Sequence, residues 1–96
     1  MDAKRPTGQL TKRDLRTQIS ALDMQLLALL KKRFDVCVLT CDKKEHVEDE
    51  TRDNELRNLW QKEANKLKLR PEFSLSLLEL ILQESKRLQT DHKKAA

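Results

Sequence analysis

The sequence predicts an all-α fold of three helices, one long and two shorter. The chain has 96 residues, of which 18 are leucine, whereas 3% are aromatic and 38% are charged. This composition is typical of long helices with one face in water, and sheets would need more Val, Ile, Tyr and Thr. With one Gly and two Pro, the chain also lacks the turn residues of barrels and sandwiches and the glycine-rich loops that bind phosphates.

The first helix is predicted to run from Thr11 to about Lys44. Thr11 and Asp14 form an N-terminal cap, and apolar residues then recur in steps of three and four at positions 15, 19, 22, 26, 29 and 30. No Gly or Pro lies between Gly8 and Pro71, so about 30 residues can form one helix, roughly 45–50 Å long. A chain of this size cannot cover such a helix alone, which indicates that a second copy packs against it.

Two shorter helices are predicted after a polar stretch at residues 45–50. Asp49 or Thr51 caps the second helix. Pro71 marks the next boundary and is compatible with the first turn of a third helix, from Glu72 to about Thr90. The apolar residues at helical spacing are Leu56, Leu59, Trp60 and Leu67 in the second helix and Leu75, Leu78, Ile81, Leu82 and Leu88 in the third.

The length allows one domain, with a disordered lead at residues 1–10, a helical domain at 11–91 and a tail at 92–96. No apolar run is long enough for a signal peptide or a membrane span, so we expect a cytoplasmic protein without membrane contact. The net charge of +4 lies largely in the tails, and aromatic residues are few, so nucleic-acid binding is not indicated. Cys37 and Cys41 have no second Cys or His pair at ligand spacing, so no metal site is expected.

Two cations lie in the apolar stripe of the first helix. At about 100° per residue, Arg33 and Lys44 fall within about 40° of the line through Leu22, together with Leu26, Leu29 and Thr40. A buried cation needs a carboxylate, a carbonyl or a bound anion as its partner. Alternatively, the stripe ends near Arg33 and the long side chains extend to water.

The other two helices also carry polar residues that call for an explanation. In the third helix Ser85 and Gln89 continue the face of Leu78 and Leu82. In the second helix a cap and an acidic first turn account for Asp49 and Asp53, but a cation near a helix N-terminus is unfavourable, and Arg52 needs another reason. Arg16 lies on a second flank of the first helix, about 120° from the Leu22 line.

These residues fall into three motifs that resemble those of the all-helical chorismate mutases. The motifs are Leu15-Arg16-x-x-Ile19-Ser20-x-Leu22-Asp23-x-x-Leu26-Leu27-x-Leu29-Leu30-x-x-Arg33, then Asp49-x-x-Arg52-Asp53, and then Ser85-x-x-x-Gln89. They occur in order over roughly residues 12–90, and three motifs together are far more specific than one. The resemblance implies an intertwined homodimeric helical bundle, in which two long first helices pack together and each pocket draws residues from both chains.

The resemblance also implies an activity, the Claisen rearrangement of chorismate to prephenate in the shikimate pathway of aromatic amino-acid biosynthesis. This step needs no cofactor, no metal and no covalent intermediate. By similarity, Arg33 and Arg52 bind the substrate carboxylates, and Arg16 reaches in from the partner chain. Lys44 and Gln89 donate hydrogen bonds to the ether oxygen as its negative charge grows.

The remaining carried-over residues are Ser85, Asp49 and Asp53. Ser85 supports a carboxylate, while Asp49 and Asp53 hold the ring hydroxyl or its surroundings. The family usually has Glu at the position of Asp53. Only four residues separate Lys44 from Asp49, fewer than is common, so Lys43 is an alternative to Lys44 as the ether-oxygen donor.

Three other functions fit the same scaffold. An isochorismate pyruvate lyase and an amino-deoxychorismate mutase bind similar dicarboxylates and differ mainly in pocket details. A non-catalytic helical module that still forms a homodimer is favoured if the short loop and Asp53 have abolished the chemistry.

Overall fold

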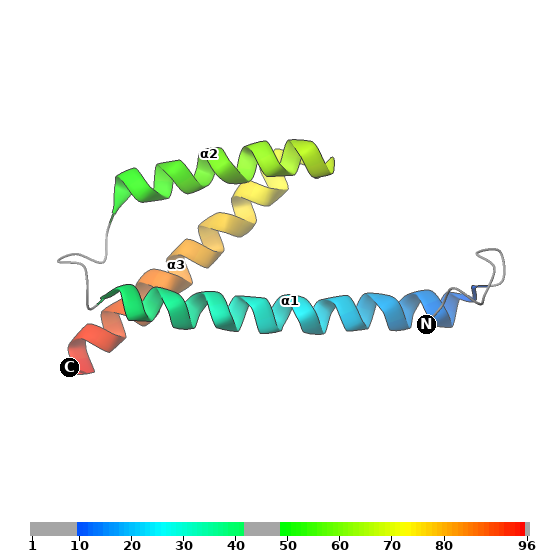
Figure 1. Cartoon of the computed structure of the whole chain (residues 1–96), viewed down its shortest axis with the longest axis horizontal. Coiled ribbons are helices and arrows are strands. Elements are labelled where there is room, and N and C mark those ends of the chain that lie inside the picture. The colour runs from blue at the N-terminus through cyan, green and yellow to red at the C-terminus, as the bar shows by residue number, and fades with distance from the viewer. Residues whose placement is uncertain (1–9, 42–48, 96) are drawn as a thin grey trace. The chain divides into compact units, whose positions relative to one another are not determined.

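The computed structural model describes residues 10–41 and 49–95, and it confirms the all-α fold in this part of the chain. Three helices follow one another: α1 (Lys12–Thr40), α2 (Glu50–Leu67) and α3 (Pro71–Ala95) (Figure 1). The chain divides into two compact units, residues 1–33 and 34–96. The first unit holds most of α1, and the second holds the end of α1 together with α2 and α3.

α1 begins with the predicted cap. The backbone N–H of Thr11 donates to Asp14 Oδ2 at 3.0 Å, and the backbone N–H of Asp14 donates to Thr11 Oγ1 at 3.1 Å. This reciprocal pair satisfies two N–H groups that the helix itself leaves without partners. The helix ends at Thr40, before the predicted end near Lys44, which lies outside the described residues. The Thr40 hydroxyl donates to the Cys37 carbonyl oxygen at 2.7 Å.

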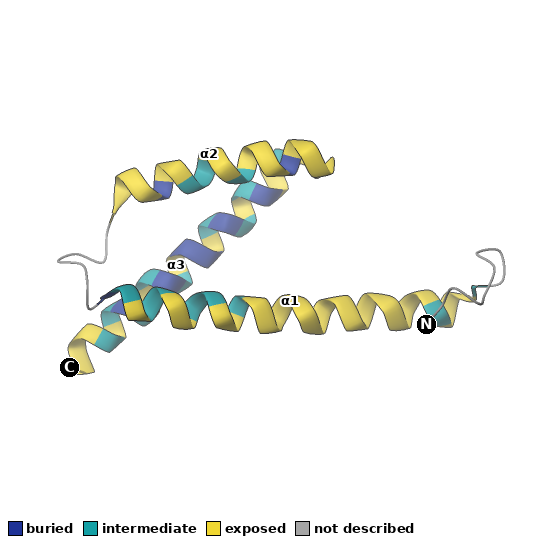
Figure 2. Ribbon diagram, viewed as in Figure 1, coloured by how far each residue is buried: buried dark blue, intermediate teal, exposed yellow. Residues whose placement is uncertain are grey.

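In the single chain α1 buries no residue. Figure 2 shows its surface as exposed over most of the helix. Leu22 and Leu29, on the main apolar stripe, are 61% and 62% exposed. The other large apolar side chains of α1 that are exposed are Leu15, Ile19, Met24, Leu26, Leu27, Val36 and Leu39. Large apolar side chains exposed in this number along one helix are typical of an interaction face.

The ends of α2 follow local chemistry. Asp49 caps the N-terminus by accepting a hydrogen bond from the backbone N–H of Arg52 at 3.1 Å, as predicted. At the C-terminus Lys68 takes a left-handed conformation with φ of 62°. Leu69 then donates its backbone N–H to the Ala64 carbonyl oxygen at 2.9 Å, which closes the turn before α3.

α3 is longer than the sequence pattern predicts. It starts at Pro71 and continues beyond Thr90 into the segment we assigned to a tail, as far as Ala95. Its last turn carries His92, Lys93 and Lys94. Cations are favourable at a helix C-terminus because they face the negative end of the helix dipole, and no helix breaker occurs in this segment.

α2 and α3 run in opposite directions and pack together (Figure 1). The buried side chains of α3 include Leu78, Ile81 and Leu82, and α2 adds Ala64. Leu78 is fully buried, so this face of α3 forms the core of the second unit. No helix in residues 10–41 and 49–95 combines the length and the apolar content needed to cross a membrane.

Candidate functional site

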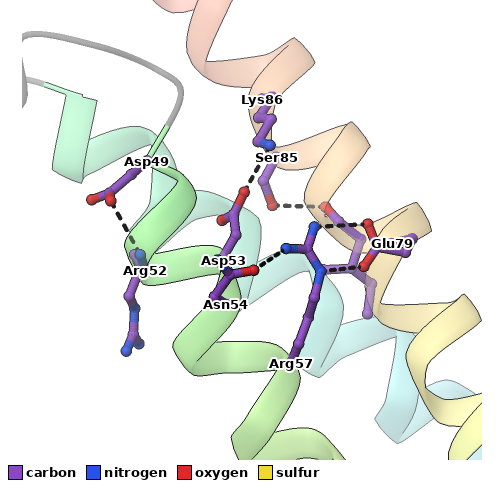
Figure 3. Close-up of polar contacts among 9 residues, drawn as sticks. Asp49, Arg52, Asp53, Asn54, Arg57, Glu79, Ser85 and Lys86 are labelled. Carbon is purple, nitrogen blue, oxygen red and sulfur yellow. Dashed lines mark hydrogen bonds and ion pairs between the residues drawn. The ribbon is translucent and has the colours of Figure 1, made fainter.

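Two ion pairs join α2 to α3 (Figure 3). Lys86 Nζ lies 2.8 Å from Asp53 Oδ2. Arg57 donates two hydrogen bonds to the Glu79 carboxylate, from Nε at 2.7 Å and from Nη2 at 3.1 Å. Each helix contributes one acid and one base, with the acid first along the chain in both, and because the helices are antiparallel each acid lies opposite a base. The ion pairs therefore fix the register of α2 against α3 next to the predicted binding residues.

The Arg57–Glu79 pair changes the acidity of both groups. The hydrogen bonds from Arg57 hold the pKa of the Glu79 carboxyl below its ordinary value, and the nearby Lys86 charge acts in the same direction. The Glu79 carboxylate in turn raises the pKa of the Arg57 guanidinium, with a smaller contribution from Asp53. Arg57 Nη1 also donates to Asn54 Oδ1 at 2.8 Å. The four charges thus interact as one network of alternating sign.

Two predicted binding residues, Asp53 and Ser85, are buried in the second unit. Asp53 is 7% exposed and Ser85 is 5% exposed. The Ser85 hydroxyl donates to the Ile81 carbonyl oxygen of the preceding turn at 2.8 Å, an arrangement common for Ser within helices. Ser85 directly precedes Lys86, the partner of Asp53, so the ion pair lies beside both predicted residues.

Asp49 and Arg52 have a different environment. The Asp49 carboxylate is used as the α2 cap, through the backbone N–H of Arg52. The Arg52 guanidinium is exposed, with Nη1 3.6 Å from Glu55 Oε1, and Figure 3 shows it directed away from α3. In one chain, therefore, the Arg52 side chain is not directed toward the Asp53–Lys86 pair.

Gln89 is held by the end of α1. Its side chain is buried, and Nε2 donates to the Cys37 carbonyl oxygen at 2.8 Å and to Thr40 Oγ1 at 3.2 Å. The Cys41 thiol donates to the backbone carbonyl oxygen of Gln89 at 3.6 Å. Both amide hydrogens of Gln89 thus have an acceptor, and the longer of the two hydrogen bonds goes to a hydroxyl that can rotate.

The other predicted residues lie in the first unit or outside the described residues. Arg16 is exposed and Arg33 is half-buried on α1. Lys44 and its alternative Lys43 fall between the described segments.

Several residues beside the site were not predicted, namely Thr40, Arg57, Glu79 and Lys86. A signal for the ion pairs is present in the sequence. Asp53 and Arg57 are four residues apart, whereas Glu79 and Lys86 are seven apart, and both spacings keep the side chains on one helix face. Because the acid precedes the base in both helices, an antiparallel arrangement brings each acid opposite a base.

The second unit also contains an apolar groove of about 360 Å³ near the turn between α2 and α3. Its wall includes Trp60, Leu67, Leu69 and Phe73 and none of the predicted binding residues. Among the described residues, this wall has no Lys or Arg that could pair with a dicarboxylate. In residues 10–41 and 49–95 no group of three His, Cys, Asp or Glu side chains is arranged to hold a metal ion.

The fold and the site define an all-helical protein. A polar cluster lies between the antiparallel helices α2 and α3, and the buried Gln89 amide of α3 contacts the end of α1. Residues 15–90 match the family model of chorismate mutase type II. The match covers most of the chain, which therefore belongs to the chorismate mutase type II family. All eight predicted site residues lie within the matched range. No curated protein and no solved structure gave a significant match.

Proposed function

We propose that this chain catalyses the rearrangement of chorismate to prephenate. The observation that carries the proposal is the family match over residues 15–90, which includes every residue of the three motifs. The reaction is an isomerisation in which one carbon–oxygen bond breaks while one carbon–carbon bond forms, so no group is transferred to the protein. Catalysis then depends on holding the substrate in a reactive conformation and on stabilising charge in the transition state.

The arginines bind the two carboxylates of the substrate in this proposal. Arg33 and Arg52 act from one chain, and Arg16 acts from its partner. The planar guanidinium matches a carboxylate with two parallel hydrogen bonds, which a lysine cannot provide. The half-buried position of Arg33 in an otherwise apolar stripe supports an anion-binding role for this residue.

Gln89 and Lys44 donate to the ether oxygen of the substrate. In the structure the Gln89 amide donates to Cys37 and, through a longer hydrogen bond, to Thr40. Exchange of Thr40 for the ether oxygen keeps the shorter hydrogen bond, which orients the amide. The new hydrogen bond strengthens as negative charge grows on the oxygen, so it stabilises the transition state more than the bound substrate.

Asp53, Asp49 and Ser85 complete the pocket. Asp53 accepts a hydrogen bond from the ring hydroxyl, Asp49 supports its surroundings, and Ser85 supports a carboxylate. The burial of Asp53 and Ser85 in the second unit supports these roles, because a buried polar side chain holds a fixed orientation.

The active form in this proposal is a homodimer. A single chain exposes the apolar residues of α1 on its main stripe and on a second flank. Pairing of two α1 helices would remove this surface from water and would bring Arg16 of one chain to the pocket of the other. The proposal also includes a cytoplasmic location and a role in aromatic amino-acid biosynthesis.

A substrate panel tests the proposed reaction. The purified 96-residue chain is incubated separately with chorismate, isochorismate and amino-deoxychorismate, with Arg33→Ala as the matched control. We expect conversion of chorismate to prephenate by the wild type only. Unchanged chorismate with consumption of isochorismate or amino-deoxychorismate would instead identify a lyase or an amino-deoxychorismate mutase.

A melting experiment distinguishes the enzyme from a non-catalytic module. A dicarboxylate mimic of the transition state should raise the melting temperature of the wild type, because a ligand that binds only the folded state stabilises it by mass action. No shift at saturating concentration, together with no turnover, would favour the module.

A further inference from the structure

The Asp53–Lys86 pair lies where the proposed function places the ring hydroxyl of the substrate. Asp53 is an acid in a pocket that binds a dianion, and its side chain is 10% exposed. An uncompensated carboxylate there would repel the substrate. The Lys86 ammonium, 2.8 Å from Asp53 Oδ2, cancels this charge at close range.

The ion pair also orients the Asp53 carboxylate. A carboxylate has two oxygens that each accept hydrogen bonds, so contact through Oδ2 keeps Oδ1 able to accept from a hydroxyl. Aspartate is one methylene shorter than the glutamate usual at this position of the family, and a short side chain depends more on a fixed orientation to reach its ligand. Lys86 comes from the opposite helix, next to Ser85, and its side chain is 26% exposed.

We propose that Lys86 is a positioning residue that makes the pocket select a ring hydroxyl over a ring amine. This inference rests on the proposed function. Through its contact with Asp53, Lys86 presents a neutralised, oriented acceptor to a hydroxyl. A substrate with a protonated amino group at the same ring position would instead approach a second cation, and like charges at close range disfavour binding.

Lys86→Met tests the inference with chorismate and amino-deoxychorismate as paired substrates. The measured quantity is the ratio of kcat/KM for chorismate to kcat/KM for amino-deoxychorismate. Loss of the Lys86 charge should lower this ratio about tenfold or more, because the hydroxyl loses an oriented acceptor and the amine gains an unpaired carboxylate. Lys86→Arg keeps the cation and should keep the ratio within about threefold of the wild type.

A neighbouring residue gives a control with the same change of charge. Arg87 is exposed and pairs with Glu84 and Asp91 on its own helix, so Arg87→Met should leave the ratio unchanged. If Lys86→Met lowers kcat/KM for both substrates by the same factor, Lys86 has only a structural role and the inference is wrong.

A double variant keeps the test valid if Lys86→Met alone does not fold. Removal of one partner leaves the other charge buried, whereas Asp53→Asn combined with Lys86→Met removes both charges. In the Asp53→Asn background, Lys86→Met should lower the ratio, because it removes the cation that disfavours the protonated amine, and an unchanged ratio would overturn the inference. Failure of the proposed function is seen separately, because the wild type would then not convert chorismate.

Discussion

Replacement of the Gln89 amide by a carboxyl should make the stability of the protein depend on pH. In the wild type the amide donates to the Cys37 carbonyl oxygen at 2.8 Å and to Thr40 Oγ1 at 3.2 Å, and Gln89 is 4% exposed. In Gln89→Glu an ionised carboxylate would face the Cys37 carbonyl with no hydrogen to donate. The protonated carboxyl would keep one donor and so restore one of the two hydrogen bonds.

The size of the effect follows from burial and from the loss of the donor. Both disfavour the ionised form, so they should raise the pKa of the new carboxyl from about 4.3 by about two to three units in the folded state. Below about pH 3.3, one unit under the unfolded pKa, the group is protonated in both states and causes no pH-dependent loss of stability. As the pH rises through the interval between the two pKa values, the unfolded state loses its proton first and stability falls, by about 3–4 kcal/mol in total.

Urea unfolding measures this difference. The free energy of unfolding of Gln89→Glu and of the wild type is compared at about pH 4 and about pH 7.5, at one protein concentration because chain assembly contributes to stability. Gln83→Glu is the matched control, since Gln83 is exposed on the same helix. An equal difference from the wild type at both pH values would show that the carboxyl is solvated and that the buried contact with α1 does not form.

Three further outcomes are expected. Asp49→Ala should lower the free energy of unfolding by about 1 kcal/mol through loss of the α2 cap, and Asp49→Ser should recover most of it in the same urea experiment. The pKa of the Glu79 carboxyl is lower in the folded than in the unfolded state, so this group stabilises the protein above its unfolded pKa, and the stabilisation is lost as the pH falls through the folded pKa. Glu79→Gln should therefore make the free energy of unfolding depend less on pH in the acid range. An unchanged pH dependence would show that the contact with Arg57 does not form. Arg33→Ala should abolish turnover and leave the melting temperature equal or higher, because a half-buried cation in the apolar stripe loses part of its hydration. Loss of both turnover and stability would indicate a structural ion pair.

Local features were predictable from the sequence. The Thr11 cap, the Asp49 cap and the start of α3 at Pro71 depend on residues within one helical turn. Periodicity also placed Ser85 and Gln89 on the face of α3 that is buried, because the repeat of 3.6 residues determines which positions share a face.

Contacts between helices were not predictable in the same way. Periodicity gives the face of Asp53 but not which residue of another helix lies opposite, and that depends on the register of α2 against α3. The pair with Lys86 was missed for this reason. The extent of α3 beyond Thr90 was missed because no apolar residue marks its last turn, where charge favours the helix instead.

In the proposed homodimer each chorismate mutase pocket is shared between two copies of the chain. Two inactive homodimers test this sharing, because Arg16→Ala and Arg33→Ala should each remove one arginine from every pocket. When the two variants are unfolded, mixed in equal amounts and refolded, about half of the dimers should contain one chain of each kind. One pocket of each mixed dimer would then have both arginines intact, while the other would lack both.

Refolding of the mixture should restore about a quarter of the wild-type chorismate mutase sites, whereas each variant refolded alone should stay inactive. Activity that appears only in the mixture cannot come from a contaminating enzyme. If the refolded mixture stays as inactive as the separate variants, although gel filtration of differently tagged chains shows that mixed dimers have formed, the pocket is not shared through Arg16.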